Sequence, residues 1–110
     1  MMLEVNGRQL ETDEEGYLVN MSDWSPEVAE VMSRMDGLEL GQDHWEIINF
    51  LREYYEKYQI APAIRILTRE VGKKLGEDKG NSKYLFSLYP LGPAKQACRY
   101  AGLAKPTGCV

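Results

Sequence analysis

The sequence predicts a mainly α-helical domain with a short β-hairpin at its N-terminus and a mobile arm at its C-terminus. The first observation is composition, because 110 residues with 44% hydrophobic and 27% charged side chains suit one soluble globular domain. The second is that apolar residues recur at helical spacing between residues 26 and 101, in segments separated by glycine and proline. We expect a helical domain over residues 1–102 and an arm over residues 103–110.

The first residues have the pattern of a two-stranded hairpin. Leu3, Val5 and Leu10 alternate with polar residues, as in strands with one buried face. Asn6-Gly7 lies between the two strands and supplies residues that tolerate the positive φ angles of a type I′ turn. The sequence therefore predicts strands on either side of Asn6-Gly7.

Five helices are expected after the hairpin. Ser25-Pro26 supplies an N-cap and a proline at the first helical position, and Gly37 ends the first helical pattern. The second helix is the longest, with acidic residues in its first turn. The expected helices cover residues 26–35, about 40–58, 62 to about 76, a short segment capped by residues 80–82, and 94 to about 101.

Charge is divided between the two halves of the chain. The formal net charge is −4, but residues 1–60 hold 14 acidic and 4 basic side chains, whereas residues 61–110 hold 3 acidic and 9 basic ones. Chance and helix-dipole matching can produce such a division. A basic half that meets an acidic partner surface or nucleic acid would also explain it.

Most classes of catalytic site find no support in the residues. His44 is the only histidine, and beside Trp45 at a helix start it is expected to cap or to pack. With two cysteines it does not complete a usual zinc ligand set, and no nucleophile signature, phosphate loop or dinucleotide motif is present. We therefore expect no metal and no cofactor. Tyr54, Tyr55 and Tyr58 are expected to cover an edge of the core.

A cytoplasmic protein is expected from the absence of targeting patterns. The N-terminal residues lack the basic and apolar regions of a secretory signal, and no run approaches the roughly 18 apolar residues of a membrane span. Cytoplasmic thiols stay reduced unless a disulfide has a function. The two cysteines are therefore the residues whose role needs an explanation.

Cys98 lies in the last expected helix, and Cys109 is the penultimate residue of the arm. The eleven residue steps between them reach about 36 Å when extended, whereas a disulfide needs Cα atoms within roughly 7 Å. The same segment can therefore project Cys109 into a partner or fold it back on Cys98. This arrangement suits sulfur carriage, because one thiolate can hold a sulfur atom as a persulfide while a second thiol attacks it.

The residues around both cysteines form a specific motif, GPAKQACRYAGL at residues 92–103 followed by KPTGCV at residues 105–110. This motif closely resembles the C-terminal signature of the DsrC/TusE family. The resemblance covers essentially the whole chain and continues at residues 13–18, 44–46, 61–63 and 80–85. It implies a small, mostly helical fold with a helix-turn-helix-like core, a β-hairpin and a swinging C-terminal arm. It also implies a sulfur-trafficking carrier of the sulfurtransferase type, which is not a stand-alone turnover enzyme.

The resemblance also implies roles for the two cysteines. In the family the penultimate cysteine bears the sulfur, which maps to Cys109, and the second cysteine, matched by Cys98, marks the DsrC branch. Cys98 would then resolve the persulfide as a disulfide or trisulfide. The implied partners are dissimilatory sulfite reductase, sulfurtransferase donors of the TusA/DsrE type and a membrane-bound thiol–disulfide redox complex. One departure is Ala104, where relatives often carry proline, and its greater freedom in φ loosens the arm slightly.

Two alternatives stay open. A TusE-like relay for tRNA thiolation needs Cys109 alone, since that branch typically lacks the second cysteine. A DNA-binding module would place residues 61–74 in a helix-turn-helix, although the whole chain is acidic.

The basic residues nearest the cysteines are Lys95, Arg99 and Lys105. We favour protein docking for them, in which they steer the arm into a partner or contact an anionic sulfur oxide there. As ordinary solvated helix cations they would have no such role.

Overall fold

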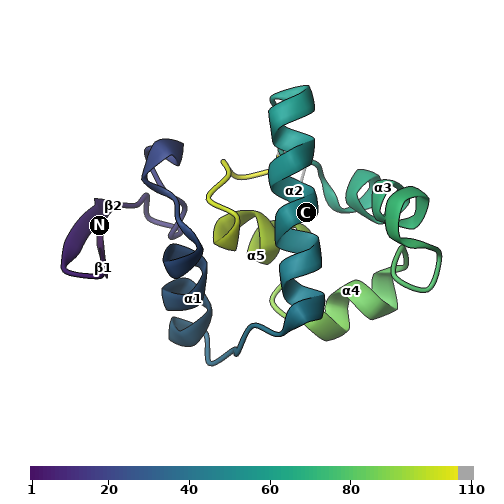
Figure 1. Ribbon diagram of the computed structural model, residues 1–110, viewed down its shortest axis with the longest axis horizontal. Coiled ribbons are helices and arrows are strands. Elements are labelled where there is room, and N and C mark those ends of the chain that lie inside the picture. Colours follow the sequence, from purple (N-terminus) through teal and green to yellow (C-terminus); the bar gives the residue numbers. More distant parts are fainter. Residues whose placement is uncertain (107–110) are drawn as a thin grey trace.

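The computed structural model describes residues 1–106 and confirms a mainly α-helical fold with an N-terminal hairpin (Figure 1). Residues 107–110, and with them Cys109, lie outside the described part of the chain. The elements are, in chain order, strands β1 (Met2–Val5) and β2 (Arg8–Glu11), the 3₁₀ helix η1 (Met21–Asp23), and helices α1 (Pro26–Met35), α2 (Gln42–Tyr58), α3 (Ile64–Leu75), α4 (Ser82–Leu88) and α5 (Pro93–Tyr100).

The hairpin forms as its pattern predicts. Asn6 and Gly7 have φ angles of 51° and 78°, the positive pair that a type I′ turn requires. The two strands pair antiparallel with Leu3 opposite Leu10, and the alternating residues Leu3, Val5 and Leu10 are buried. Helix α1 packs against β1, so the hairpin closes one end of the helical core.

Local sequence signals account for most helix boundaries. Helix α1 begins at Pro26 as predicted, although the Ser25 side chain makes no capping hydrogen bond and contributes only its extended backbone. Helix α4 begins after Asn81, whose Oδ1 accepts a hydrogen bond of 2.8 Å from the Tyr84 N–H. This Asn81 cap satisfies one of the backbone donors that a helix N-terminus leaves unpaired.

The third helix begins later than the sequence predicts. Pro62 is the predicted first residue, but α3 begins at Ile64 with Ala63 as an extended N-cap. Ala61 and Pro62 are both buried, so tertiary packing engages the residues that local preference would allow to start the helix. The prediction for this boundary was wrong by two residues.

Helix α5 lies at the centre of the molecule. It packs against α1, α2, α3 and α4, and Figure 1 shows it between α1 on one side and α2 on the other. Six of its eight residues are buried, and the small side chains Ala94 and Ala97 allow neighbouring helices to approach closely. The helix that carries Cys98 is therefore the central element of the core.

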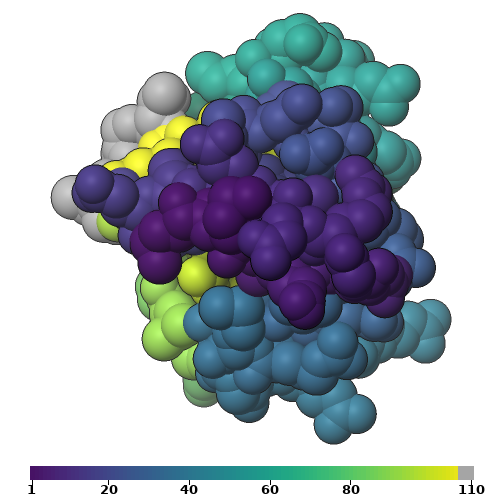
Figure 2. All heavy atoms as spheres, turned by 90° about the vertical axis from the view of Figure 1, so that its left-hand side faces the viewer, coloured from purple at the N-terminus to yellow at the C-terminus, as the bar shows by residue number. Residues whose placement is uncertain are grey.

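The hairpin and α1 cover one side of α5. In Figure 2 the N-terminal residues lie across the middle of the face toward the viewer, and only parts of the yellow segment that ends at residue 106 are visible behind them. Within residues 1–106, no helix combines the length and apolar character that crossing a membrane would need.

Candidate functional site

Cys98 lies inside the core, near the C-terminal end of α5. Its side chain is 0% exposed. The chain leaves α5 and turns back at once, because the Leu103 N–H donates a hydrogen bond of 3.0 Å to the Cys98 carbonyl. Leu103 is itself buried, so the predicted arm begins directly beside Cys98. The position of Cys109 relative to Cys98 lies outside the described residues.

Two side chains from distant parts of the sequence hold the carbonyls at the end of α5. The Trp24 indole N–H donates to the Tyr100 carbonyl at 2.7 Å, and the Arg52 guanidinium donates to the Ala101 carbonyl at 2.7 Å. The carbonyls of a last helical turn have no partner within the helix, so these bonds act as a C-cap supplied by η1–α1 and α2. Burial lowers the pKa of Arg52, although the nearby Glu56 carboxylate opposes the shift.

Trp24 and Arg52 also contact each other and the turn. The Arg52 guanidinium carbon lies 3.8 Å from the centroid of the Trp24 ring, in cation–π geometry. The ring packs on Gly102, whose φ is +75° and where a Cβ would lie 2.4 Å from Trp24 Cδ1. Gly102 therefore permits both the turn after α5 and the close approach of the indole.

A polar network fixes the other side of the same helix. The Tyr100 hydroxyl donates to Asp36 Oδ2 at 2.6 Å and accepts a bond of 2.8 Å from Gln96 Nε2. Gln96 Oε1 in turn accepts from the Leu91 N–H at 2.9 Å, and Arg99 donates to the same Asp36 oxygen. Burial, together with the Asp36 carboxylate, raises the pKa of Tyr100 to about 12, while the bond from Gln96 opposes this. Tyr100 is therefore a neutral donor at ordinary pH.

The three basic residues singled out from the sequence gather on one side of the molecule. Lys95 and Arg99 line a hollow of about 180 Å³, and Glu15 lines it as well. Lys105 forms an ion pair of 2.9 Å with Glu15, in which both side chains are about half exposed. Arg99 is less exposed and pairs with Asp36. A docking role for Arg99 or Lys105 would therefore compete with pairing inside the chain.

The division of charge along the sequence becomes pairing across the fold. Four ion pairs of the described structure join an acidic residue of the first half to a basic residue of the second. They are Glu53–Lys74, Glu46–Lys79, Asp36–Arg99 and Glu15–Lys105. Part of the basic charge of the second half is thus balanced within the molecule.

His44 caps and packs, as its position in the sequence predicts. Its Nδ1 accepts from the Gly41 N–H at 3.0 Å, which leaves Nε2 as the donor to the Leu88 carbonyl at 2.9 Å. The ring also makes an edge contact with Tyr89, whose hydroxyl donates to the His44 carbonyl at 2.6 Å. His44 therefore ties the start of α2 to the end of α4.

The predicted tyrosine cluster partly covers the edge of the core. Tyr54 and Tyr55 are partly buried against it, whereas Tyr58 is 50% exposed and packs on Tyr54.

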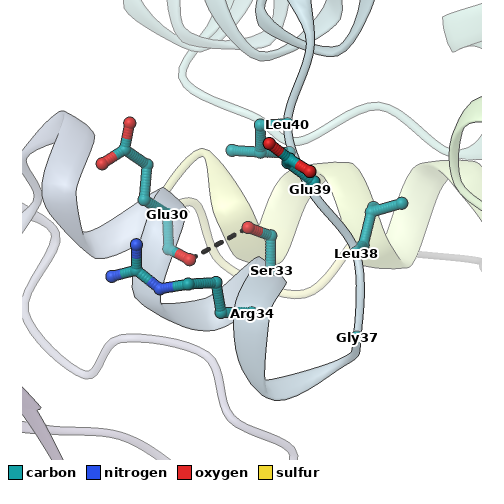
Figure 3. A pocket seen from close by; sticks show the side chains of 7 residues that line it. All are labelled: Glu30, Ser33, Arg34, Gly37, Leu38, Glu39 and Leu40. Atoms are coloured by element: carbon teal, nitrogen blue, oxygen red, sulfur yellow. Dashed lines mark hydrogen bonds between the residues drawn. The ribbon is translucent and has the colours of Figure 1, made fainter.

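A further hollow lies apart from Cys98. A hollow of about 580 Å³ is formed by the end of α1 and the loop before α2 (Figure 3). In this hollow the Ser33 hydroxyl already donates to the Glu30 carbonyl at 3.0 Å, and neither Cys98 nor the three basic residues line it.

Within residues 1–106, no three histidine, cysteine or acidic side chains gather closely enough to hold a metal ion.

The sequence predicted the two cysteines and the basic residues, but it missed Trp24, Arg52 and the Asp36–Tyr100 pair. The sequence holds a weak signal for Arg52, because this residue lies one turn after Ile48 on the apolar side of α2. A cation at such a position is unusual unless it has a partner. The indole and the guanidinium both bind backbone carbonyls. Every residue has a backbone carbonyl, so no residue type in the sequence identifies these acceptors. These contacts therefore emerge only from the fold.

Comparisons with known proteins identify a matching family, relatives in sequence and solved structures with a similar fold. The family model described as DsrC like protein matches residues 4–110. Sulfurtransferase TusE of Yersinia pestis is 48% identical over 109 residues, which cover 99% of this chain and 100% of that protein. The NMR structure of Allochromatium vinosum DsrC shares 70% identity with a TM-score of 0.91, covering 99% of this chain and 97% of that one. The crystal structure of the oxidized gamma-subunit of the dissimilatory sulfite reductase (DsrC) from Archaeoglobus fulgidus shares 45% identity with a TM-score of 0.85, covering 100% of both chains.

Proposed function

The chain belongs to the DsrC-like protein family, and we propose that it is a sulfur carrier in which Cys109 accepts sulfur and Cys98 resolves it. The observation that carries this proposal is the Leu103–Cys98 hydrogen bond, which brings the start of the arm back to the buried thiol. Six residue steps separate Leu103 from Cys109 and span at most about 21 Å. Cys109 can therefore either return to Cys98 or extend into a partner protein.

The proposed chemistry conserves atoms and electrons in two exchange steps. In the first step the Cys109 thiolate attacks the terminal sulfur of a donor persulfide, which yields a Cys109 persulfide and the thiolate of the donor. In the second step the Cys98 thiolate attacks the Cys109 sulfur, which forms a Cys98–Cys109 disulfide and releases hydrosulfide. The two thiols supply the two electrons that reduce the carried sulfur. A sulfur atom delivered two electrons more oxidised would instead join both thiolates as a trisulfide.

The buried position of Cys98 gives this sequence of steps a direction. A thiol that is 0% exposed is shielded from donors in solution. Sulfur is therefore expected to arrive at Cys109 first and to meet Cys98 only when the arm folds back.

The DsrC branch is the one we propose. The TusE-like branch needs one cysteine, whereas this chain has two, and the second is built into the central helix of the fold. A DsrC-type carrier would act as a protein co-substrate of dissimilatory sulfite reductase and receive sulfur from TusA/DsrE-type donors. A membrane-bound thiol–disulfide redox complex would then reduce the disulfide again.

The relay for tRNA thiolation is the second candidate, because curated relatives named TusE match this chain along nearly its whole length at 46–48% identity. The two functions differ in their need for Cys98. A Cys98→Ser variant that keeps full sulfur-transfer function in cells would favour the relay. Loss of that function would favour the DsrC branch.

Mass spectrometry tests the acceptor directly. The protein is incubated with a small-molecule persulfide donor such as glutathione persulfide, and the C-terminal peptide is isolated. The expected result is a mass gain of about 32 Da on the peptide that contains Cys109, which is lasting in Cys98→Ser and transient in the wild type, where Cys98 resolves the persulfide. A Cys109→Ala variant that gains the same mass on this peptide would refute Cys109 as the acceptor.

A further inference from the structure

We propose that Trp24 and Arg52 are positioning residues that form a clamp on residues 100–102 and set the pivot of the arm after Leu103. The proposal rests on the proposed function, since it concerns how far the sulfur-bearing thiol can travel. Neither residue touches a cysteine side chain in the described contacts; both act through the backbone that connects Cys98 to the arm.

The first part of the clamp is the indole. Its N–H binds the Tyr100 carbonyl at 2.7 Å, and its ring lies against Gly102 so closely that a Cβ there would be 2.4 Å from Cδ1. Trp24 comes from the segment between η1 and α1, 76 residues away from Tyr100 in sequence. It therefore anchors the end of α5 to the N-terminal part of the fold.

The second part is the guanidinium. Arg52, in α2, donates to the Ala101 carbonyl at 2.7 Å, and its guanidinium carbon lies 3.8 Å from the centroid of the Trp24 ring. A charged donor to a partly buried carbonyl makes one of the stronger hydrogen bonds in a protein. Because the indole and the guanidinium contact each other, removing either one loosens the other.

The clamp holds the turn that follows α5. Ala101, Gly102 and Leu103 are all buried, and the Gly102 and Leu103 amides bind the Arg99 and Cys98 carbonyls. Past Leu103, Ala104 and Lys105 are exposed, and Pro106 is buried again. In residues 104–106 the structure describes one hydrogen bond, which Lys105 donates to Glu15 at the surface.

This difference sets the reach of the thiol. With the pivot after Leu103, Cys109 is carried by six residue steps, or at most about 21 Å. With the clamp released and the pivot at Tyr100, nine steps would span about 31 Å. A shorter tether keeps the local concentration of Cys109 near Cys98 high and limits how deep a partner site can be.

Amide hydrogen exchange measured by NMR tests the clamp without any sulfur chemistry. Arg52→Gln removes the charged donor, Arg52→Lys keeps one cationic donor, and Trp24→Phe keeps a ring but removes the N–H. Arg65→Gln and Trp45→Phe are matched controls, because neither residue takes part in these contacts and Arg65 is exposed.

We expect Arg52→Gln to speed exchange of the Gly102 and Leu103 amides at least tenfold, while the Leu51 amide in α2 is unchanged. Arg52→Lys should restore part of the protection, and Trp24→Phe should give a smaller increase of a few fold. A spin label on Cys109, in the Cys98→Ala background, should broaden amides farther from Leu103 once Arg52 is replaced by Gln.

Unchanged exchange at Gly102 and Leu103 in both Arg52→Gln and Trp24→Phe would overturn the proposal. An equal rise at Leu51 would also overturn it, since the two residues would then support only overall stability. Either failure leaves sulfur transfer to Cys109 intact, and loss of sulfur transfer leaves the exchange result intact.

Discussion

The chain on the two sides of Leu103 is held in different ways. On the helix side, Tyr100 to Leu103 are buried and their backbone is bound by an indole, a guanidinium and two turn hydrogen bonds. On the arm side, Ala104 and Lys105 are exposed, Lys105 is held by one ion pair between half-exposed side chains, and only Pro106 is buried. Hydrogen bonds from charged groups contribute about 1.5–3 kcal/mol, whereas exposed ion pairs contribute about 0–1 kcal/mol. The Cys98 thiol is thus held in the buried core, and the segment that leads to Cys109 starts from a turn whose backbone is held by these hydrogen bonds.

The largest effect is expected from Gly102→Ala. The new Cβ would lie 2.4 Å from Trp24 Cδ1, and alanine would have to adopt a φ of +75°. Backbone strain costs about 1–2 kcal/mol and overpacking about 1–3 kcal/mol, so the free energy of unfolding should fall by about 3 kcal/mol. Urea unfolding followed by circular dichroism measures this change.

Gly37→Ala is the matched control for that substitution. Gly37 has a φ of +73°, but nothing lies within 4 Å of the added Cβ, so only the backbone cost of about 1–2 kcal/mol should appear. Equal losses in the two variants would show that Trp24 does not press on the turn after α5.

A smaller effect is expected from Tyr100→Phe. At pH 7 this variant loses the bond to Asp36 and leaves Gln96 Nε2 without its acceptor, which should cost about 1–2 kcal/mol. Because the folded protein keeps the Tyr100 proton up to a pKa of about 12, wild-type stability should fall as the pH rises from about 10 to 12. In this window the unfolded chain releases a proton that the folded chain retains.

Urea titrations at pH 7, 9 and 11 test the pH dependence. The fall in stability between pH 9 and 11 should be shallower in Tyr100→Phe than in the wild type. Some fall should remain, because burial also raises the pKa of Tyr89. The same slope in both proteins would contradict the role given to the Tyr100–Asp36 bond.

The smallest effect on stability is expected from Lys105→Glu. The variant loses the ion pair with Glu15 and adds repulsion, but both side chains are about half exposed, so the change should stay below about 1 kcal/mol. It should shrink further in 0.5 M salt, because salt screens exposed charges. If Lys105 steers the arm, the salt dependence of partner binding should weaken in this variant. An unchanged salt dependence would argue against steering.

The secondary structure was predictable where one or two adjacent residues decide it. Asn6-Gly7 set the hairpin turn, Pro26 set the start of α1, and Asn81 caps α4. The start of α3 was not predictable, because burial of Ala61 and Pro62 depends on the rest of the core.

The sequence singled out the two cysteines of the candidate site, and their roles stay a prediction, whereas the contacts around Cys98 were not predicted. A cysteine one residue from the chain end draws attention by its place alone, and Cys98 stands in a distinctive motif. The clamp joins residues 49 and 76 positions apart through backbone carbonyls, so no local pattern encodes it. The charge division was visible in the sequence, but its pairing across the fold required the positions of Asp36 and Glu15.

The most direct measurement follows both cysteines after one sulfur atom has been loaded. Wild type and Cys98→Ser are loaded on Cys109, separated from the donor, and followed by intact-mass spectrometry together with a sulfide assay. Wild type should lose the gain of about 32 Da, end about 2 Da below the reduced mass as the disulfide forms, and release about one sulfide per chain. Cys98→Ser should keep the added sulfur. Release of sulfide at the same rate from both proteins would contradict Cys98 as the resolving thiol.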